Sequence, residues 1–377
     1  YPASDDAILE RKEDDGTMVE PVFYAPVIPM VLVNGSKGIG TGFSTDIASY
    51  NPLDVITYIR YKLSGPDGVC PPKMTPYWKG FKGTVTWLSH DESKVLIRGC
   101  YEREGQNVIR VTELPIGFWT DDFKQHLENI MNPAPPAAGK TASSKTKSVI
   151  KEYADMSTDT LVDVRITFVA GAIDELLPNA SGVAGVDGIE KLLKLTTTHS
   201  TTNMHAFNDQ EQLRKFESAE EMADEYFTVR LGLYEKRRLY LLDILRKELT
   251  RVSNKAKYIQ GNLNDEIDLR RKKQDEVNTM LSAFGLDKED DSYKYLTRLP
   301  MDSVTHENVE RLLSDKKEKE KQIADLTKAT AISLWRQDLE ACETEYRILL
   351  AEYNQQMTTS TEVPQKTKKK QKKVVLK

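Results

Sequence analysis

The chain has 377 residues, a formal net charge of -5 at pH 7 and 29% charged residues. Its average composition therefore gives no indication of a DNA-binding protein, so any basic surface must come from a local concentration of charge. The length suffices for two or three domains with cores of their own.

Cysteine usage and hydropathy narrow the class of protein. Cys70, Cys100 and Cys342 are widely spaced and form no CxxC pair, which indicates a reducing, intracellular compartment and argues against a zinc module. The five histidines show no spacing typical of metal ligands. No signal peptide and no long apolar span is found, which excludes insertion into a membrane.

An apolar run from Val27 to Val33 follows the first 25 residues. It is interrupted by Pro29, is too short for an ordinary helix and is rich in β-branched residues, so we expect a buried extended segment. Glycines then recur closely and allow the backbone to turn sharply; they are Gly35, Gly38, Gly40 and Gly42. Their spacing matches neither a Walker motif nor GxGxxG, so a nucleotide pocket is not indicated.

Ile39 stands between two of these glycines, and two interpretations of it remain open. Its side chain can be tucked inwards in a packed loop. Alternatively it is a wedge that enters between stacked bases from the minor groove and kinks the duplex.

The next elements are a helix and three strands. Asn51 is a good helix cap with Pro52 in the first turn, and the helix should stop at Ser64-Gly65-Pro66. Alternating or β-branched runs predict strands at 83–88, 94–98 and 107–112. Residues 77–82 interleave aromatic residues with Lys79 and Lys82, which fits either a phosphate-contacting surface or a strand with solvated lysines.

Shorter elements follow up to residue 195. The sequence predicts a capped helix from Thr120, a basic loop over 132–151, a strand over 161–169, a loop over 179–188 and a short helix over 189–195.

Two heptad seams dominate the second half of the chain. The first runs from Leu242 to Leu263 and the second from Trp335 to Tyr353, each in steps of three and four. The first seam lies in an uninterrupted stretch from Ala219 to about Gly261 that contains neither proline nor a cluster of turn residues. At ~1.5 Å per residue each seam is roughly 27–32 Å long, so we expect an antiparallel pair lying side by side along nearly its whole length. A helical knot built from 277–286, 296–299 and 309–326 should close the far end.

The last residues are polar and basic, with seven lysines in the final twelve positions. Such a block is predicted to be disordered, and it can attract phosphate nonspecifically, address the protein to the nucleus, or simply be solvated.

Several motifs together resemble type IIA DNA topoisomerases of the eukaryotic and viral kind. They are Glu20-Pro21, Tyr24-x-Pro26-Val-Ile-Pro-Met-Val-Leu-Val-Asn-Gly35, Gly38-Ile-Gly-Thr-Gly42, Tyr50-Asn-Pro52, Glu113-Leu-Pro115, Asn254-Lys-Ala-Lys-Tyr-Ile259 and Leu334-Trp-Arg-x-Asp-Leu339. The resemblance implies that Ile39 intercalates into the gate DNA and bends it. It also implies a DNA-binding set of Asn34, Gly35, Ser36, Lys37, Gly38, Ile39, Gly40 and Thr41, with Lys79 and Lys82 on a tower that grips the DNA arms. Lys37 departs from the family, whose cellular members usually carry an acid there, so it can contact a phosphate or be solvated.

The same resemblance implies where the chemistry lies. The nucleophilic tyrosine of the family follows an arginine a short way upstream of Tyr1, so Tyr1 is not expected to be that residue and no catalytic residue is assigned in this chain. The Mg²⁺ site and the ATPase are expected further upstream, with no metal or cofactor held here. The chain then reads as the C-terminal part of the breakage-reunion core of a longer polypeptide.

The expected architecture is mixed α+β, with a β-rich tower followed by a long antiparallel coiled coil. We predict four segments: 1–50, the end of the winged-helix cleavage region with the intercalating loop; 51–215, the tower; 216–356, the coiled coil and dimerising exit gate (C-gate); and 357–377, a basic disordered tail.

The implied function is ATP-dependent breakage, passage and religation of double-stranded DNA by a homodimer, in the nucleus or, for a large DNA virus, in the host cytoplasm. The alternative is a non-catalytic DNA-architectural or coiled-coil scaffold protein.

Overall fold

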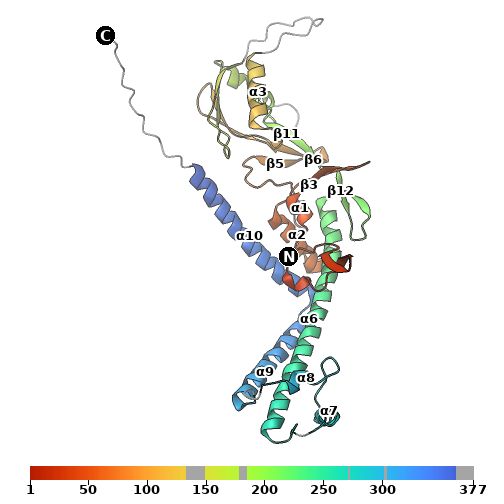
Figure 1. The fold of residues 1–377 in the computed structure, drawn as a ribbon. Coiled ribbons are helices and arrows are strands. Elements are labelled where there is room, and N and C mark those ends of the chain that lie inside the picture. The colour runs from red at the N-terminus through yellow and green to blue at the C-terminus, as the bar shows by residue number, and fades with distance from the viewer. Residues whose placement is uncertain (133–148, 178–184, 271, 301–303, 362–377) are drawn as a thin grey trace, which may run out of the picture. The chain divides into compact units, whose positions relative to one another are not determined.

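The computed structural model describes residues 1–132, 149–177, 185–270, 272–300 and 304–361 and has a mixed α and β fold (Figure 1). This confirms the predicted fold class. Contacts divide the chain into two compact units: Tyr1–Val27 with Thr228–Lys377, here called the helical unit, and Ile28–Phe227, the sheet unit. The four predicted segments stay a prediction. Most of the predicted loops at 132–151 and 179–188 lies outside the described residues, as does the predicted tail of 357–377 from residue 362 onwards. Residues 357–361 of that tail are helical, so the prediction of disorder is wrong there.

The sheet unit begins with a short helix, so the predicted extended segment at 27–33 is wrong. Helix α1 spans Met30–Asn34, with Pro29 at its N-cap. The ring of Pro29 fixes φ in the range that suits a helix start, and Leu32 becomes fully buried on the single turn that follows. Gly35 ends the helix at a φ of +68°, which a residue with a side chain adopts only at a cost.

Strands β3 (Ser36–Ile39) and β4 (Ser44–Ile47) form an antiparallel hairpin where we expected a loop. Helix α2 (Pro52–Ser64) follows, and it begins and ends as predicted. The Asn51 side chain accepts a hydrogen bond from the Leu53 backbone N–H at 3.0 Å, which satisfies one of the free donors of the first turn.

The sheet unit also contains two antiparallel sheets, which confirm the predicted strands. The first has the order β11-β6-β5, from β5 (Thr84–Leu88), β6 (Asp91–Arg98) and β11 (Thr196–Ser200). The second has the order β7-β8-β10-β9, from β7 (Cys100–Arg103), β8 (Val108–Glu113), β9 (Ile150–Asp155) and β10 (Val164–Phe168).

Three helices complete this unit: α3 (Thr120–Met131), α4 (Ala172–Leu176) and α5 (Gly188–Leu192). Phe123 and Leu127 of α3 pack with Ile109, Val164 and Ile166 of the second sheet in one buried cluster. The helix predicted from Thr120 is present, but its N-cap is Trp119, which makes no capping hydrogen bond through its side chain. Strands β12 (Met204–Phe207) and β13 (Leu213–Phe216) form a further hairpin.

Helix α6 (Ala219–Leu263) runs for 45 residues from the sheet unit into the helical unit, as the uninterrupted pattern predicted. Helices α7 (Gln274–Ala283), α8 (Lys294–Thr297) and α9 (His306–Lys328) follow it. Their apolar side chains pack against the end of α6, where Ile259, Leu281 and Leu296 are almost completely buried. This cluster confirms the predicted helical knot.

Helix α10 (Ala331–Thr361) carries the second seam, but only its first part is buried. Trp335 and Leu339 are fully buried, whereas Leu349 is 48% exposed. Within the first seam, α6 is instead paired with α9, where Lys319 of α9 lies 2.6 Å from Glu248 of α6. The start of α10 packs beside Tyr234 of α6, before the first seam begins. The prediction that the two seams lie side by side along nearly their whole length is therefore wrong.

The N-terminal segment of the helical unit contains η1 (Ala3–Asp5) and the hairpin β1 (Arg11–Asp14) and β2 (Thr17–Pro21). Asp5 is 2% exposed and lies 2.7 Å from the guanidinium of Arg230, which is fully buried on α6. Arg237, about two helical turns further along α6, reaches both Asp5 and Asp338 of α10, at 3.5 and 2.9 Å.

An aromatic pair completes this buried charge cluster, which we define as Asp5, Arg230, Tyr234, Arg237, Trp335 and Asp338. The Tyr234 ring stacks on Trp335 with ring centres 5.4 Å apart. The guanidinium groups of Arg230 and Arg237 each lie 4.3 Å from the centre of the Tyr234 ring. The cluster joins three distant parts of the sequence, and its two cations balance its two carboxylates.

Candidate DNA interface

The β3–β4 hairpin presents Ile39 at its tip. In the strand register Ile39 faces Ser44, and the Gly40 N–H closes the turn by donating to the Phe43 carbonyl at 2.8 Å. The Ile39 side chain is 95% exposed, the most exposed large apolar side chain in the described residues. The inward interpretation is therefore excluded, and the exposed position required for a wedge is present.

The glycines around Ile39 have different roles. A Cβ on Gly35 would lie 2.7 Å from the Ile47 carbonyl oxygen, and one on Gly40 would lie 3.1 Å from the Phe43 ring. Gly42 has a φ of +87° in the turn, whereas a Cβ on Gly38 would meet nothing within 4 Å. Three of the four glycines thus shape the hairpin, and Gly38 only leaves its surface bare.

The foot of the hairpin is fixed by the segment that leads into β12. The Asp46 N–H donates to the Asn203 carbonyl at 2.8 Å, and the Thr45 hydroxyl donates to the His205 carbonyl at 2.8 Å. The Asn203 amide also donates to the Ser44 hydroxyl at 3.0 Å. Strand β4 is therefore held by backbone and hydroxyl groups, and none of these bonds depends on the Ile39 side chain.

A groove of about 560 Å³ lies beside this foot, within the sheet unit. We call it the hairpin groove; its lining includes Asn34, Ser36, Lys37, Asp46, Trp78, Thr198 and His199. Trp78 meets the His199 ring edge-on, with centres 6.2 Å apart. The groove thus combines hydroxyl and amide groups, two rings and one pair of opposite charges.

The charged pair is Lys37 and Asp46, which face each other across the two strands. Their Nζ and Oδ2 atoms are 3.2 Å apart, and the Lys37 side chain is 82% exposed. Lys37 is therefore neither simply solvated nor held in place by burial. An exposed ion pair of this kind contributes little to stability.

The structure brings only part of the predicted binding set to this groove. Residues 34–37 line it, and residues 38–41 continue to the exposed tip. Lys79 is exposed and follows Trp78 directly in the chain, in a turn with Gly80 at a φ of +87°. Lys82 is exposed but does not line the groove, and its backbone N–H donates to Glu113 at 3.2 Å. Residues 77–82 form no strand, so that alternative is wrong.

Asp46, Thr198 and His199 were not predicted as site residues. Asp46 is separated from Lys37 by a turn that the sequence did not reveal, and only the strand register shows the pair. The available signal for β11 was the polar, threonine-rich run Thr196-Thr-Thr-His-Ser200.

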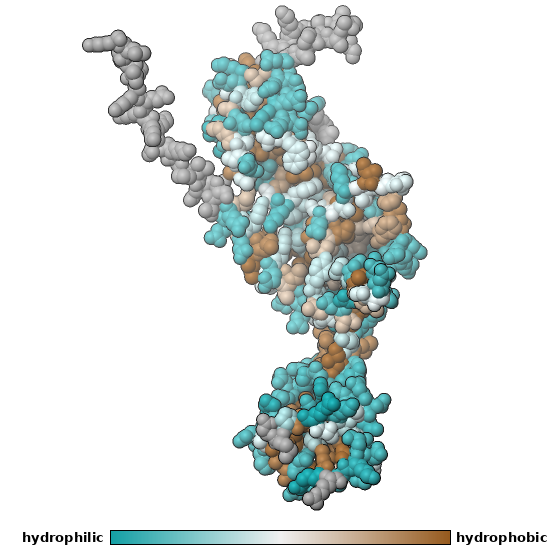
Figure 2. All heavy atoms as spheres, viewed as in Figure 1, coloured by the Kyte–Doolittle hydropathy of each residue, from teal (hydrophilic) through white to brown (hydrophobic). Residues whose placement is uncertain are grey.

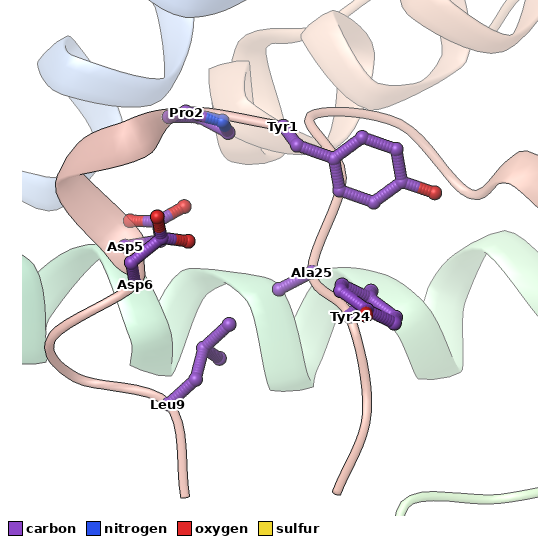
Figure 3. A pocket seen from close by; sticks show the side chains of 7 residues that line it. All are labelled: Tyr1, Pro2, Asp5, Asp6, Leu9, Tyr24 and Ala25. Carbon is purple, nitrogen blue, oxygen red and sulfur yellow. The ribbon is translucent and has the colours of Figure 1, made fainter. Parts of the chain in front are cut away.

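Tyr1 lies in the helical unit beside a pocket of about 320 Å³, formed by residues 1–9 with Tyr24 and Ala25 (Figure 3). The Tyr1 side chain is 75% exposed and meets the Tyr24 ring edge-on at 5.9 Å. Among the buried tyrosines, desolvation raises the pKa of both Tyr50 and Tyr234. Their phenols are therefore suited to packing and hydrogen bonding.

The described residues offer no group of three or more His, Cys, Asp or Glu side chains that could hold a metal ion. The described part of the chain therefore does not fit a Mg²⁺ site. Across the described ranges, none of the helices has the length and apolar character needed to cross a membrane.

The fold is similar to that of a solved Plasmodium falciparum protein described as the topoisomerase II DNA-binding, cleavage and re-ligation domain. The two chains are 28% identical with a TM-score of 0.72, over 96% of this chain and 49% of that one. The family model of the DNA gyrase/topoisomerase IV A-subunit matches residues 1–340. The chain therefore belongs to this family of type IIA topoisomerases, which confirms the predicted resemblance.

Named relatives agree with this assignment. DNA topoisomerase 2 of Pisum sativum is 34% identical over 90% of this chain, and that of Acanthamoeba polyphaga mimivirus is 30% identical over 88%. The chain spans 24% and 30% of the length of these two relatives. The family match disfavours the non-catalytic scaffold alternative.

Proposed function

We propose that this chain forms the DNA-bending and exit-gate part of an ATP-dependent type IIA DNA topoisomerase that breaks one duplex, passes a second through it and religates the first. The full enzyme would act as a homodimer on double-stranded DNA inside the cell, in the nucleus or in the cytoplasm of an infected host. The nucleophilic tyrosine, the Mg²⁺ site and the ATPase would belong to other parts of that enzyme.

The single observation that carries this proposal is the exposure of Ile39 at the tip of a hydrogen-bonded hairpin. An isoleucine that is 95% exposed adds nothing to the core, but it can enter between two base pairs and kink the duplex. Kinking costs about a few kcal/mol, which contacts along the bent DNA offset, so easily deformed steps would be preferred as cleavage sites.

The remaining predicted contacts support the wedge. The segment of residues 34–41 would approach the edges of the DNA minor groove. Lys79 and Lys82, which are exposed, provide positive charge further along the same unit. These residues would contact phosphates and hold the DNA in register, because phosphate contacts position a protein on a duplex without reading its sequence.

The helical knot at the end of α6 would form the exit gate. Its interior is a complete apolar core, yet Leu313 of α9 remains 42% exposed. Figure 2 shows apolar surface among hydrophilic side chains where α7, α8 and α9 lie. Such a surface suits contact with the same element of a second copy.

The DNA-bending role is tested by Ile39→Ala in the full-length enzyme, with fluorescent dyes at the two ends of a duplex. Removing the wedge should reduce energy transfer, which reports bending, and lower the yield of cleaved DNA. Val69→Ala is the matched control, because Val69 is a β-branched residue of the same unit that is 90% exposed. Equal bending and cleavage by the two variants would refute the wedge.

The exit gate is tested by Leu313→Asp, which places a charge on the proposed contact surface. The fraction of dimer in sedimentation velocity should fall at low protein concentration. The control is Glu310→Asp, which changes an exposed residue of the same helix and keeps its charge. An unchanged dimer in Leu313→Asp would remove the knot from the interface.

A further inference from the structure

We propose that the hairpin groove binds one phosphate of the DNA backbone, and that Lys37 exchanges its partner Asp46 for this phosphate when the wedge is inserted. This inference rests on the proposed DNA-bending function. It assigns Asp46 a role as the competing carboxylate that limits the affinity of the free hairpin for nucleic acid.

The position of Lys37 on β3 follows from strand geometry. Alternate residues of a strand project on the same face, so Lys37 and Ile39 share a face and lie about 6.6 Å apart along β3. The minor groove is about 6 Å wide and is bounded by the two phosphate backbones. When Ile39 enters this groove, Lys37, two residues earlier on the same face of β3, would therefore lie near the backbone phosphates that border the groove.

The two members of the charged pair differ in mobility. Asp46 is held on β4 by its own backbone N–H, which donates to Asn203, and by the neighbouring Thr45 hydroxyl, which donates to His205. The Lys37 side chain is long and 82% exposed, and its charged partner within the described part of the chain is the Asp46 carboxylate at 3.2 Å. Lys37 can therefore swing towards a phosphate while the carboxylate remains in place.

The exchange is energetically accessible. An exposed ion pair is weak because water screens both charges. A phosphate also offers several acceptor oxygens to the three donors of an ammonium group. Binding of a phosphate next to Asp46 nevertheless brings two negative charges together, so the carboxylate opposes binding both by occupying Lys37 and by repelling the ligand.

The surrounding groove supplies neutral groups for the same ligand. The Thr198 side chain is exposed on β11, and Ser36 is exposed at the start of β3. Both residues line the groove, and hydroxyl groups are common phosphate contacts in protein–DNA interfaces. A mixed lining of this kind fits a sugar-phosphate backbone better than an apolar ligand.

The test uses the full-length enzyme and a fluorescent duplex whose binding is measured by anisotropy over a series of salt concentrations. Asp46→Asn should bind about 3–10-fold more tightly, because Lys37 is released and the repulsion is removed. Lys37→Met should bind about 3–10-fold more weakly, and the slope of log K against log salt should fall by about one, as expected for one lost phosphate contact.

The control is Asp91→Asn, which makes the same charge change in another exposed pair of the sheet unit, Lys94 and Asp91 at 2.9 Å. Equal changes for Asp46→Asn and Asp91→Asn would overturn the exchange, since only the total charge would then matter. An unchanged salt slope in Lys37→Met would overturn the phosphate contact.

The same variants separate this inference from the proposed function. If Ile39→Ala loses bending while Asp46→Asn and Lys37→Met bind like the parent, the wedge stands and the phosphate exchange is wrong. If Ile39→Ala bends DNA normally while Lys37→Met loses one unit of salt slope, the phosphate site stands and the wedge is wrong.

Discussion

The hairpin tip and the buried charge cluster place side chains in opposite environments. Ile39, an apolar residue, is 95% exposed in the sheet unit, whereas Arg230, a charged residue, is fully buried in the helical unit. The hairpin is held by its backbone and by hydroxyl groups, so it does not need Ile39. The cluster is held by its charges, so it cannot lose one of them without leaving another unpaired. The proposed function and the stability of the fold are therefore expected to depend on different residues, so that each can be changed separately.

The largest effect is expected in the buried charge cluster. Asp5→Ala should lower the free energy of unfolding by about 3–5 kcal/mol, because Arg230 would keep a buried charge without its carboxylate at 2.7 Å. Urea unfolding measures the loss. Asp6→Ala is the control, since Asp6 is exposed and its removal should change stability by about 0.5 kcal/mol or less. Similar losses of unfolding free energy in both variants would show that the buried pair contributes no more to stability than an exposed carboxylate.

A smaller effect is expected where the hairpin begins. Gly35→Ala should destabilise the protein by about 1–3 kcal/mol, because residue 35 has a φ of +68° and its new Cβ would lie 2.7 Å from the Ile47 carbonyl oxygen. Thermal unfolding of Gly38→Ala provides the comparison, since that Cβ would meet nothing within 4 Å. If Gly38→Ala proved the more harmful, the hairpin would not be shaped as described.

An exposed ion pair of the sheet unit should matter less and should depend on pH. Lys124 lies 2.7 Å from Asp155, and together with the Ser157 hydrogen bonds it holds the pKa of Asp155 at about 2. This pKa lies below the ordinary value of about 3.9. The pair therefore stabilises the fold above about pH 4 and loses its contribution as the pH falls towards 2.

The Lys124→Met variant tests that dependence. At pH 6 the variant should be only slightly less stable than the parent, because solvent screens a partly exposed pair. The difference should shrink as melting curves are recorded at successively lower pH down to about 2.5. A difference that stays constant with pH would contradict the assignment to Asp155.

The smallest effect on stability is expected for Ile39→Ala. The side chain is almost fully exposed, so its removal should change the free energy of unfolding by about 0.5 kcal/mol or less. Chemical denaturation of the variant measures this directly. A loss above about 2 kcal/mol would mean that Ile39 packs against other side chains, and the contrast between the two regions would disappear.

Local signals in the sequence predicted a large part of the fold. The Asn51 cap and the unbroken pattern of α6 depend on neighbouring residues, and both elements begin close to the predicted positions. Helix α1 was missed because a single turn ending at Gly35 carries too few residues to show a helical period. The β3–β4 hairpin was missed because glycines weaken the strand pattern.

The long-range contacts could not be predicted in this way. Asp5 and Arg230 are far apart in the sequence, and a charged residue on a long helix is ordinarily solvated. The exposed position of Ile39 was one of two interpretations of the sequence, and the structure decides between them. The Lys37–Asp46 pair depends on the strand register, which only the structure reveals.

The wedge is tested most directly by placing 2-aminopurine, a fluorescent base that is quenched by stacking, at successive positions of a cleavage-site duplex. The full-length enzyme should raise the fluorescence at one step on each strand, because Ile39 separates the two bases there. Ile39→Ala should bind the same duplex without that increase. An equal increase with the variant, or none with the parent, would contradict the insertion of Ile39 into the base stack.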